Sequence, residues 1–578
     1  MDKSTSSAVS GTLGEGEEQS VLEIPLESEA LAHRKQSDLQ NESGFITDDN
    51  LGIIESGDGG KRESIPGGND DADGNTFSSC VGSFGTKEEE EQQASSSDPE
   101  ALTVELTKAL DDLSVTTSGS ESEQIQSNGV EAIRDDNDSD MSPLWRSHKH
   151  HVFILSEAGK PIYSRHGNEE KMVTFFGLLQ ALVSFVQSDG DTIRGVKVGE
   201  TSIVFLVKSP LILVCVSQMS ESISQIESHL TYFHNQILSI LTAKQLQTIF
   251  EKRKNYDLRR LLSGSERLLN NLAGLIEVDP SFVLGAVRCL PLANTVRDSI
   301  SQTITTVLNK HKPSVSVVFA LLVTNCQLVS IVRMKKVFMH PMDLHIILNL
   351  IDSSESFKTV DSWVPICLPR FDSSGFMYAH VSYLAEDCQA CLVLLTTDRN
   401  SFFPLSEAKQ KIVDRLRKQN SLDAINASMN NKWPTMSYVN VPEVRHFLYK
   451  AKCRAQFVSP VLDVPYLDHN TEDEESPPEE LSRDCPRAAK KISPELERLY
   501  STYYRMHSRL HAQARPVKII YWVDDKENWL GWNTSNFELY VALEPLIKKS
   551  AAISAVNKLI NWVQKEERRI FIVHAPTF

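Results

Sequence analysis

The chain has 578 residues, which is room for three or four domains of ordinary size. Its net charge of −18 divides sharply: residues 1–142 hold 33 acidic and 8 basic side chains, which leaves 44 acidic and 51 basic side chains for residues 143–578. Residues 143–578 form a mildly basic body. This charge indicates either that the body contacts a negatively charged surface or that the acidic tail itself covers the basic surface of the body. No apolar run reaches the ~20 residues of a membrane-spanning helix.

Cysteine usage and the amino terminus indicate the compartment. The nine cysteines are scattered along the chain, and most lie inside apolar runs, as buried reduced thiols do. The polar amino terminus lacks the apolar core of a secretory signal. We therefore expect a soluble cytoplasmic protein with reduced thiols.

Residues 1–142 are predicted to be a long disordered acidic tail. They are rich in serine, aspartate, glutamate and glycine and contain few aromatic residues. Such a segment cannot bury enough apolar surface to offset the entropy lost on folding. The short apolar stretch at 101–113 is interpreted as a fluctuating amphipathic segment, and a helix formed on a partner is the alternative.

Residues 145–275 are predicted to form the first folded domain. Two strand-like runs flank a turn at Gly159, a helix spans 171–188, and three further strand-like runs lead into a helix at 222–241. The later helix has the single apolar stripe of a helix that lies on one sheet. The helix at 171–188 is apolar around most of its circumference. We therefore expect another element or another chain to cover its second side.

Two further domains, at 280–425 and 435–578, are predicted to repeat this order of elements. In the second domain we expect a hairpin at 314–333, a helix at 341–350, strands at 363–368, 375–384 and 390–397, and a helix at 404–418. In the third domain we expect a short helix at 441–451, an acidic loop at 468–480, a helix at 494–513, strands at 517–523, 529–532 and 537–543, a helix at 547–566 and a strand at 570–574. The predicted fold class is α/β, with three consecutive αβα sandwiches.

No motif in the sequence supports covalent catalysis. The nearest match to a phosphate-binding loop, at 57–62, lacks its first glycine and its hydroxyl residue. Neither a serine-hydrolase elbow nor a His-Glu-x-x-His pair occurs. Cys388 and Cys391 form a lone C-x-x-C, which we interpret as structural thiols, with a metal or redox site as the alternative. We expect no catalytic residue, no cofactor and no metal, so the chain is not predicted to be an enzyme.

Three histidines, His148, His150 and His151, lie beside the start of the first predicted strand. In an extended chain His148 and His150 can share a face, whereas His151 points away. No further ligand is near them in the sequence, and zinc needs several convergent side chains. We interpret the group as a solvated basic start of the strand, with a zinc site as the alternative.

Clusters of lysine and arginine occur along the basic body. Any single cluster is interpreted as a solvated helix face. Together they can bind anionic lipid headgroups, because each well-placed cation contributes about 1 kcal/mol. The residues assigned to this role are Arg333, Lys335, Lys336, Lys548 and Lys549. Nucleic acid is not expected as a partner, because no recognition motif accompanies the charge.

Several segments of residues 145–578 carry a distinctive pattern: HVFILSEAGKPIYSRHG at 151–167, IVFLVK at 203–208, DLRRLLSGSE at 257–266, CLPL at 289–292, ESFKTVDSWVPICLP at 355–369, FLYK at 447–450 and FELY at 537–540. These segments resemble the MON/SAND family, the vacuolar fusion proteins of endosome maturation. Together they extend over essentially all of 145–578. The tail at 1–142 resembles the family only in its length, acidity and serine content.

The resemblance implies a fold of three longin-type domains and a regulatory function. Family members act with a second three-longin protein, the CCZ subunit, as a guanine-nucleotide exchange factor for the late-endosomal Rab GTPase of the seventh subfamily. The first longin domains of the two subunits pair, and the GTPase docks across the pair. Such exchange needs preferential binding of the nucleotide-free GTPase and no nucleophile. The expected protein is therefore cytoplasmic and is recruited peripherally to endosomal and lysosomal membranes.

Two alternatives remain beside the exchange factor. The first is a non-catalytic adaptor or tether, because longin folds also serve as pure interaction modules. The second is a phosphoinositide-binding recruitment protein whose exchange activity belongs wholly to its partner.

Two sets of residues in the first domain are assigned from this resemblance. The apolar helix is assigned to the interface with the partner subunit, through Phe175, Phe176, Leu179, Leu182, Val183 and Phe185. The polar rim is assigned to the GTPase, through Tyr163, Ser164, Arg165, Lys171 and Thr174. For each rim residue, a structural role such as strand-edge solvation or helix capping is the alternative.

Overall fold

The structure is a computed structural model that describes most of the chain beyond residue 147. The described residues are 148–167, 171–219, 221–311, 316–386, 388–431, 433–466, 493–512, 515 and 517–578, together with the backbone of 21–24. The predicted tail at 1–142, with its segments 57–62 and 101–113, and the predicted acidic loop at 468–480 lie outside the described residues, except for one strand. That strand, β1 (Val21–Ile24), pairs antiparallel with β15 (Ile519–Val523).

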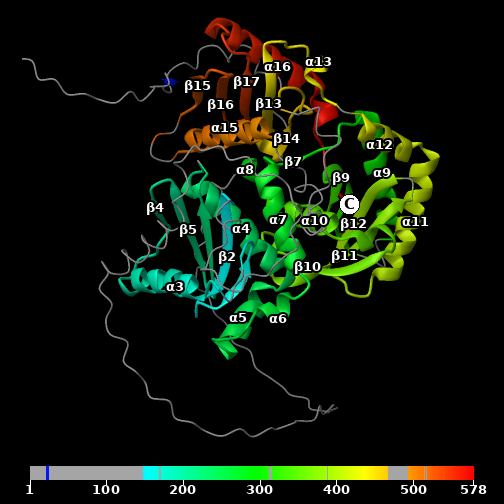
Figure 1. The fold of residues 1–578 in the computed structure, drawn as a ribbon. Coiled ribbons are helices and arrows are strands. Elements are labelled where there is room, and N and C mark those ends of the chain that lie inside the picture. The colour runs from blue at the N-terminus through cyan, green and yellow to red at the C-terminus, as the bar shows by residue number, and fades with distance from the viewer. Residues whose placement is uncertain are drawn as a thin grey trace, which may run out of the picture. The chain divides into compact units, whose positions relative to one another are not determined.

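The first domain is a five-stranded antiparallel sheet with α3 on one face and α4 on the other (Figure 1). Its elements are β2 (His150–Ser156), β3 (Pro161–Ser164), α3 (Val173–Ser188), β4 (Gly195–Val198), β5 (Thr201–Lys208), β6 (Leu211–Ser217) and α4 (Ile223–Ile240). Successive strand residues point to opposite faces, so Phe153 packs under α3 and Ile154 faces α4. The predicted turn between β2 and β3 is confirmed, with Gly159 at φ +77°.

A run of short helices connects the first domain to the second. It comprises α5 (Ala243–Lys252), α6 (Arg259–Leu262), α7 (Glu266–Val278) and α8 (Ser281–Leu284). The two-residue strand β7 (Val287–Arg288) follows and pairs parallel with β14 (Gln456–Val458) of the third domain. The connection between the first two domains is thereby built into the sheet of the third.

The second domain is also a five-stranded sheet covered on both faces. Its elements are α9 (Asn294–His311), β8 (Val317–Thr324), β9 (Gln327–Arg333), α10 (Pro341–Asp352), the 3-10 helix η3 (Glu355–Lys358), β10 (Ser362–Leu368), β11 (Asp372–Ala385), β12 (Cys388–Thr396), α11 (Phe402–Lys418) and α12 (Ser421–Asn430). Helices α9, α11 and α12 cover one face, and α10 lies on the other (Figure 1). Cys388 and Cys391 belong to the cores on opposite faces, as their spacing in a strand predicts.

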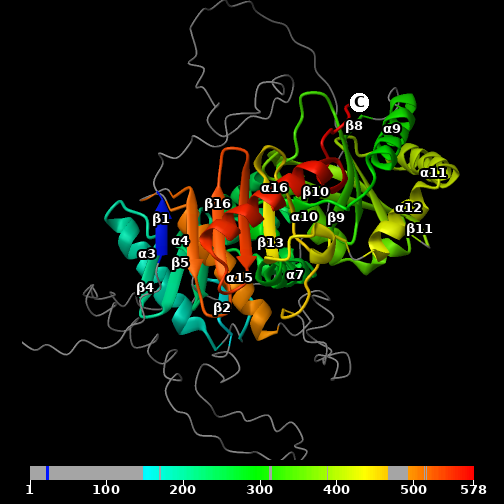
Figure 2. The ribbon, with the colours of Figure 1, turned by 90° about the horizontal axis from the view of Figure 1, so that it is seen from above.

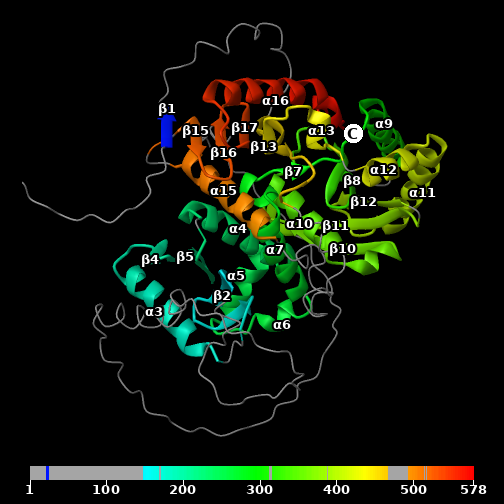
Figure 3. The same ribbon diagram turned by 45° about the horizontal axis from the view of Figure 1, so that its top comes forward.

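The third domain repeats the arrangement with α15 and α16 on the two faces of its sheet (Figure 3). Its remaining elements are α13 (Met436–Val439), β13 (Val444–Ala451), the 3-10 helix η4 (Lys452–Arg454), α15 (Pro494–Leu510), β16 (Asn528–Asn533), β17 (Phe537–Leu543) and α16 (Lys549–Ile570). In the view from above, α15 and α16 both run across this sheet, while α9, α11 and α12 gather at the second one (Figure 2).

All three sheets have the same strand order. With strands numbered within each domain, the order is 3-4-5-1-2, seen as β4-β5-β6-β2-β3, β10-β11-β12-β8-β9 and β15-β16-β17-β13-β14. The prediction of three consecutive αβα sandwiches is therefore confirmed.

Two predicted elements in the third domain differ from the structure, and helix α9 of the second domain was not predicted. The predicted short helix at 441–451 is wrong, because these residues contain β13, which pairs with β17. Phe447 and Leu448 point to opposite faces of the sheet, and both faces are buried. The predicted strand at 570–574 is also wrong, because α16 extends to Ile570 and the backbone NH of Ile572 donates to the side chain of Gln456. Helix α9 has no counterpart among the predictions.

Helix α4 is buried around its circumference, although its sequence shows a single apolar stripe. The stripe packs on the first sheet, and its opposite polar side meets the other domains. Asn349 of α10 donates to Gln236 Oε1 at 2.8 Å and to the Leu268 carbonyl at 2.9 Å. Gln225 donates to the carbonyl of Tyr504 in α15 at 2.9 Å. These hydrogen bonds satisfy polar groups that the domain contacts remove from water.

Candidate functional site

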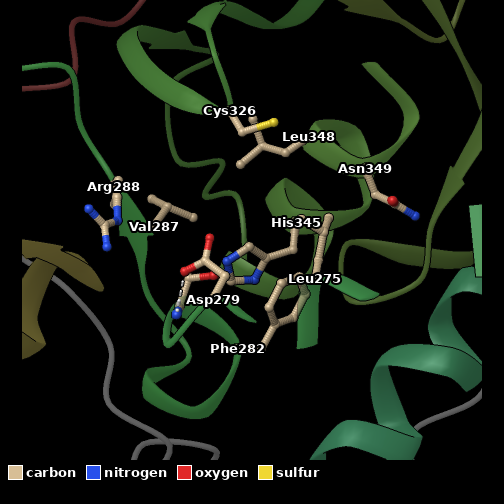
Figure 4. A pocket seen from close by; sticks show the side chains of 10 residues that line it. Leu275, Asp279, Phe282, Val287, Arg288, Cys326, His345, Leu348 and Asn349 are labelled. Carbon is tan, nitrogen blue, oxygen red and sulfur yellow. Dashed lines mark hydrogen bonds between the residues drawn. The ribbon is translucent and has the colours of Figure 1, made fainter. Parts of the chain in front are cut away.

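A small pocket in the described part of the chain lies where α7 and α8 meet α10 (Figure 4). Its free volume of about 30 Å³ has room for one or two water molecules, far below a metabolite site. The His345 ring stacks on Phe282 with centroids 4.7 Å apart, and its Nδ1 lies 3.1 Å from the Tyr232 hydroxyl. These aromatic groups are part of the packing between the first two domains.

A wider hollow of about 490 Å³ lies beside β11 and α11 in the second domain. It mixes Lys358, Lys409 and Arg417 with Asp361 and Glu386. Lys409 Nζ already pairs with Asp361 Oδ1 at 3.0 Å. The mixed charge gives no preference for an anionic or a cationic ligand.

Helix α3 has one face in the core and one apolar face directed outward. The inner face packs on β2, β5 and β6 through Phe175, Phe176, Leu179 and Val183, none more than 7% exposed. These four residues were assigned to the partner interface, and that assignment is corrected, because the sheet of their own domain already covers them. Of the six assigned residues, Leu182 is half-buried and Phe185 is 37% exposed.

The outward face of α3 consists of other residues. Val173 is 60% exposed, Gly177 is exposed, and Leu178 and Ala181 are half-buried. With Phe185 they form an apolar strip that the described residues cover only in part, since Leu178 also packs against the core beneath α3; we call these five residues the α3 outer face. The inner and outer residues of α3 can be told apart only when the strand beneath each turn of the helix is known.

The residues assigned to the GTPase divide into a structural and an exposed group. Tyr163 is 4% exposed and its hydroxyl donates to Asn270 Oδ1 at 2.8 Å. Ser164 Oγ donates to the His166 carbonyl at 2.8 Å, and Arg165 makes a two-pronged ion pair with Glu277 at 2.5 and 2.8 Å.

The exposed group lies at the amino-terminal end of α3. Lys171 and Thr174 are both exposed there, next to Val173 of the α3 outer face. Of the assigned rim, these two residues are free to meet another protein without rearrangement of the domain.

Two of the three histidines at the start of β2 are buried, contrary to the predicted solvated start of the strand. His150 and His151 are 5% and 4% exposed; His150 lies against Cys215 and His151 stacks on Phe153, so the two rings lie on opposite faces of the sheet. The His148 ring stacks on His166 with centroids 3.8 Å apart. Burial, together with the neighbouring Arg165 guanidinium, lowers the pKa of His166 to about 3. The sequence offered no signal for this burial, because the covering residues are far away along the chain.

Histidine and carboxylate side chains converge at two places among the described residues. One group is His150, Glu221 and His229, and the other is His507, His511 and Glu538. Neither group was identified from the sequence, since each joins residues from different strands and helices.

The residues assigned to lipid binding form two separate groups. Arg333 is engaged within its domain: it donates to the Val337 carbonyl at 3.0 Å and lies over the Phe338 ring. Lys335 and Lys336 beside it are exposed. The backbone of Arg333 pairs with Pro576 and Phe578, beyond the carboxyl end of α16.

Lys548 and Lys549 lie at the opposite end of α16, whose 22 residues span about 33 Å. Both lysines are exposed. The preceding Leu546 is 97% exposed and has φ +65°, which is unusual for a side chain with a Cβ. In the described residues, no helix combines the length and apolar character needed to cross a membrane.

Comparison with known proteins identifies the three domains. Family models described as the first, second and third Longin domain of FUZ, MON1 and HPS1 match residues 150–272, 315–414 and 443–567. These ranges contain the three sheets except for β7 and β1, so each αβα sandwich is a longin domain.

Full-length relatives give the same result. The chain is 44% identical over 434 residues to vacuolar fusion protein MON1 homolog A of Gallus gallus, covering 75% of this chain and 74% of that protein. It is 42% identical over 448 residues to the human homolog A, covering 78% and 64%. It is 43% identical over 437 residues to Protein SAND of Takifugu rubripes, covering 76% and 78%. The chain belongs to the MON1/SAND family of three-longin proteins.

Proposed function

We propose that this chain is one subunit of a heterodimeric guanine-nucleotide exchange factor for a late-endosomal Rab GTPase, acting in endosome maturation and in fusion with the lysosome or vacuole. Its relatives are named vacuolar fusion proteins. The observation that carries the proposal is the α3 outer face, an apolar surface on the domain that pairs with the second longin subunit in this proposal. Apolar strips of this kind are typical of protein interfaces.

The exchange mechanism uses binding energy alone. A GTPase holds its nucleotide through the phosphate loop, Mg²⁺ and ordered switch segments. A factor that binds the nucleotide-free state more tightly than the loaded state accelerates release of the nucleotide. A roughly thousandfold acceleration requires about 4 kcal/mol of differential binding. Shape and a few polar contacts suffice, which agrees with the small pocket and the mixed-charge hollow described above.

Release of labelled GDP from a panel of Rab GTPases tests the proposal. We expect the pair of this chain with its CCZ-type partner to accelerate release from the late-endosomal Rab at least 100-fold, a difference of about 2.7 kcal/mol. Each subunit alone is expected to be much weaker, because the GTPase docks across both. If the pair accelerates no Rab, the adaptor or tether function replaces the exchange factor.

We further propose that the turn before α16 contacts anionic membranes carrying phosphoinositides. Lys548 and Lys549 place positive charge at the amino end of a helix, where the helix dipole disfavours it. The adjacent Leu546 exposes nearly all of its apolar surface to water. An anionic bilayer removes both costs at once, because headgroups neutralise the lysines while the leucine enters the apolar boundary.

Charge reversal at this turn is the corresponding prediction. Lys548→Glu with Lys549→Glu is expected to weaken binding to vesicles of phosphatidylcholine and phosphatidylinositol phosphate at least 30-fold, since each lysine contributes about 1 kcal/mol. Flotation of the vesicles with bound protein measures the effect. Lys565→Glu with Arg568→Glu makes the same change in net charge on the same helix and is the matched control. Equal loss in both variants would show a general charge effect and reject a specific contact at the turn.

A further inference from the structure

Three buried side chains of the first longin domain converge where β2 meets the amino end of α4. His150 begins β2, Glu221 immediately precedes the capping residue of α4, and His229 lies two turns into that helix. His150 Nε2 is 3.8 Å from Glu221 Oε2, and His229 Nδ1 is 3.7 Å from Glu221 Oε1. A ligand atom from each of the three lies within 4.8 Å of the other two. The group is therefore a compact set of one carboxylate and two imidazoles.

These side chains are buried and only partly hydrogen-bonded, although Ser217 Oγ donates to Glu221 Oε2 at 3.4 Å. The side chains of His150, Glu221 and His229 are 5%, 4% and 2% exposed. Neither ring nitrogen of His229 has a hydrogen-bond partner among the described residues, nor does Nδ1 of His150. Buried polar atoms are nearly always paired, so the unpaired Nδ1 of His229, which lies 3.7 Å from Glu221 Oε1, indicates a missing binding partner.

A cysteine lies against the same group. In the pairing of β2 with β6, His150 is opposite Ser217 and Val152 is opposite Cys215. His150 and Cys215 are therefore diagonal neighbours on the sheet face that α4 covers. Cys215 Sγ lies 3.1 Å from His150 Nε2. The thiol therefore borders the group, but its sulfur is not among the ligand atoms that all lie within 4.8 Å of one another.

We propose that His150, Glu221 and His229 form a zinc site that ties the sheet of the first longin domain to the amino end of α4. Zinc binds three such protein ligands with a water as the fourth, and a tetrahedral site separates ligand atoms by about 3.3–3.7 Å. The two measured separations within the group, 3.7 and 3.8 Å, lie at the upper end of this range. The cation occupies the centre of the group and supplies the partner that His229 Nδ1 lacks.

The second convergent group does not fit a cation in the same way. Glu538 Oε1 is 3.2 Å from Lys450 Nζ, 3.6 Å from Lys452 Nζ and 3.4 Å from His511 Nε2. Two lysines already neutralise the carboxylate and repel a divalent ion. The Arg165 guanidinium near the proposed site is itself neutralised by its two-pronged pair with Glu277. Substitutions in the second group can therefore serve as controls for substitutions in the proposed zinc site.

The zinc site also bears on how the first and third domains are joined. Gln225 lies one helical turn before His229 on the same face of α4. Its amide donates to the Tyr504 carbonyl at 2.9 Å and lies 3.1 Å from His507 Nδ1, both in α15. A cation that holds Glu221 and His229 fixes the part of α4 that carries this contact. Removal of the metal is expected to increase hydrogen exchange at the α4 amino end and in α15.

Metal content of the purified full chain tests the proposal. We expect about one zinc ion per chain by inductively coupled plasma mass spectrometry after dialysis against a weak chelator. His229→Ala and Glu221→Gln are expected to lower the zinc content at least five-fold. His511→Ala, in the second group, is expected to leave it unchanged. A metal-free wild-type chain purified from zinc-supplemented cells, or equal loss in His229→Ala and His511→Ala, overturns the proposal.

Cobalt substitution tests the same site without relying on the folding of the alanine variants. The Co²⁺ form of the full chain is expected to show the strong visible bands of a tetrahedral ion. Glu221→Gln, a substitution of similar size, is expected to lose these bands while its circular dichroism stays that of the wild type. Retention of the bands in Glu221→Gln overturns the assignment of Glu221 as a ligand.

Discussion

Replacing Arg297 by alanine is expected to cause the largest loss of stability among single substitutions in the second and third longin domains. The side chain belongs to α9 of the second domain and is 3% exposed. Its guanidinium donates hydrogen bonds of 2.7–3.1 Å to the carbonyls of Leu290, Arg568, Arg569 and Phe571. Three of those carbonyls end α16, where backbone acceptors have no partner within the helix.

The expected loss is about 3–5 kcal/mol, because the substitution strands several buried acceptors and opens a cavity. Melting of the full chain, followed by circular dichroism and by hydrogen exchange in α16, measures it. A three-domain chain need not unfold in one step, so the exchange data locate the loss. Arg297→Lys keeps the charge but lacks the planar fork, and we expect it to recover less than half of the loss.

Arg568→Ala is the control for this prediction. Its carbonyl accepts from Arg297, but its own side chain is exposed, so the change is expected to stay within about 0.5 kcal/mol of the wild type. A melting curve of Arg297→Ala that overlays that of Arg568→Ala would show that the four hydrogen bonds contribute nothing to the junction of the two domains.

The three-domain fold was predictable because local signals mark each element. The turn at Gly159 marks where β2 ends and β3 begins, and the proline at the start of α10 marks the first residue of that helix. The error at β13 arises because its run is short and buried on both faces, so it lacks the alternation that distinguishes a half-buried strand. Helix α9 was missed because threonine and isoleucine, which favour strands in isolation, supply much of its sequence.

The candidate sites were less predictable because they depend on contacts between distant segments. Because α3 is apolar around most of its circumference, its sequence indicated that a second face is covered. The sequence did not indicate which residues point away from the sheet. For α4 the opposite problem arises: Gln225 and Gln236 look solvated in the sequence, yet other domains bury them. His150 and Cys215 become neighbours only through the pairing of β2 with β6. Such pairs cannot be read from spacing along the chain.

Placing two carboxylates on the α3 outer face is expected to abolish pairing with the CCZ-type subunit. Val173→Asp with Phe185→Asp changes side chains that are 60% and 37% exposed, so the isolated chain is expected to remain folded. In the proposed pair both positions become buried. The lost apolar burial and the cost of covering two charges amount to about 4 kcal/mol or more, which predicts at least 1,000-fold weaker binding of the partner.

Phe403→Asp with Val360→Asp is a closely matched control, because it replaces the same two residue types at positions that are 80% and 67% exposed in the second domain. We expect this variant to bind the partner and to accelerate nucleotide release as the wild type does. The α3 variant is expected to lose both properties while its melting curve is unchanged. If it still binds the partner with wild-type affinity, the subunits pair through another surface. If it binds the partner normally but loses exchange, the α3 outer face meets the GTPase itself, because only the nucleotide-release step would then depend on it.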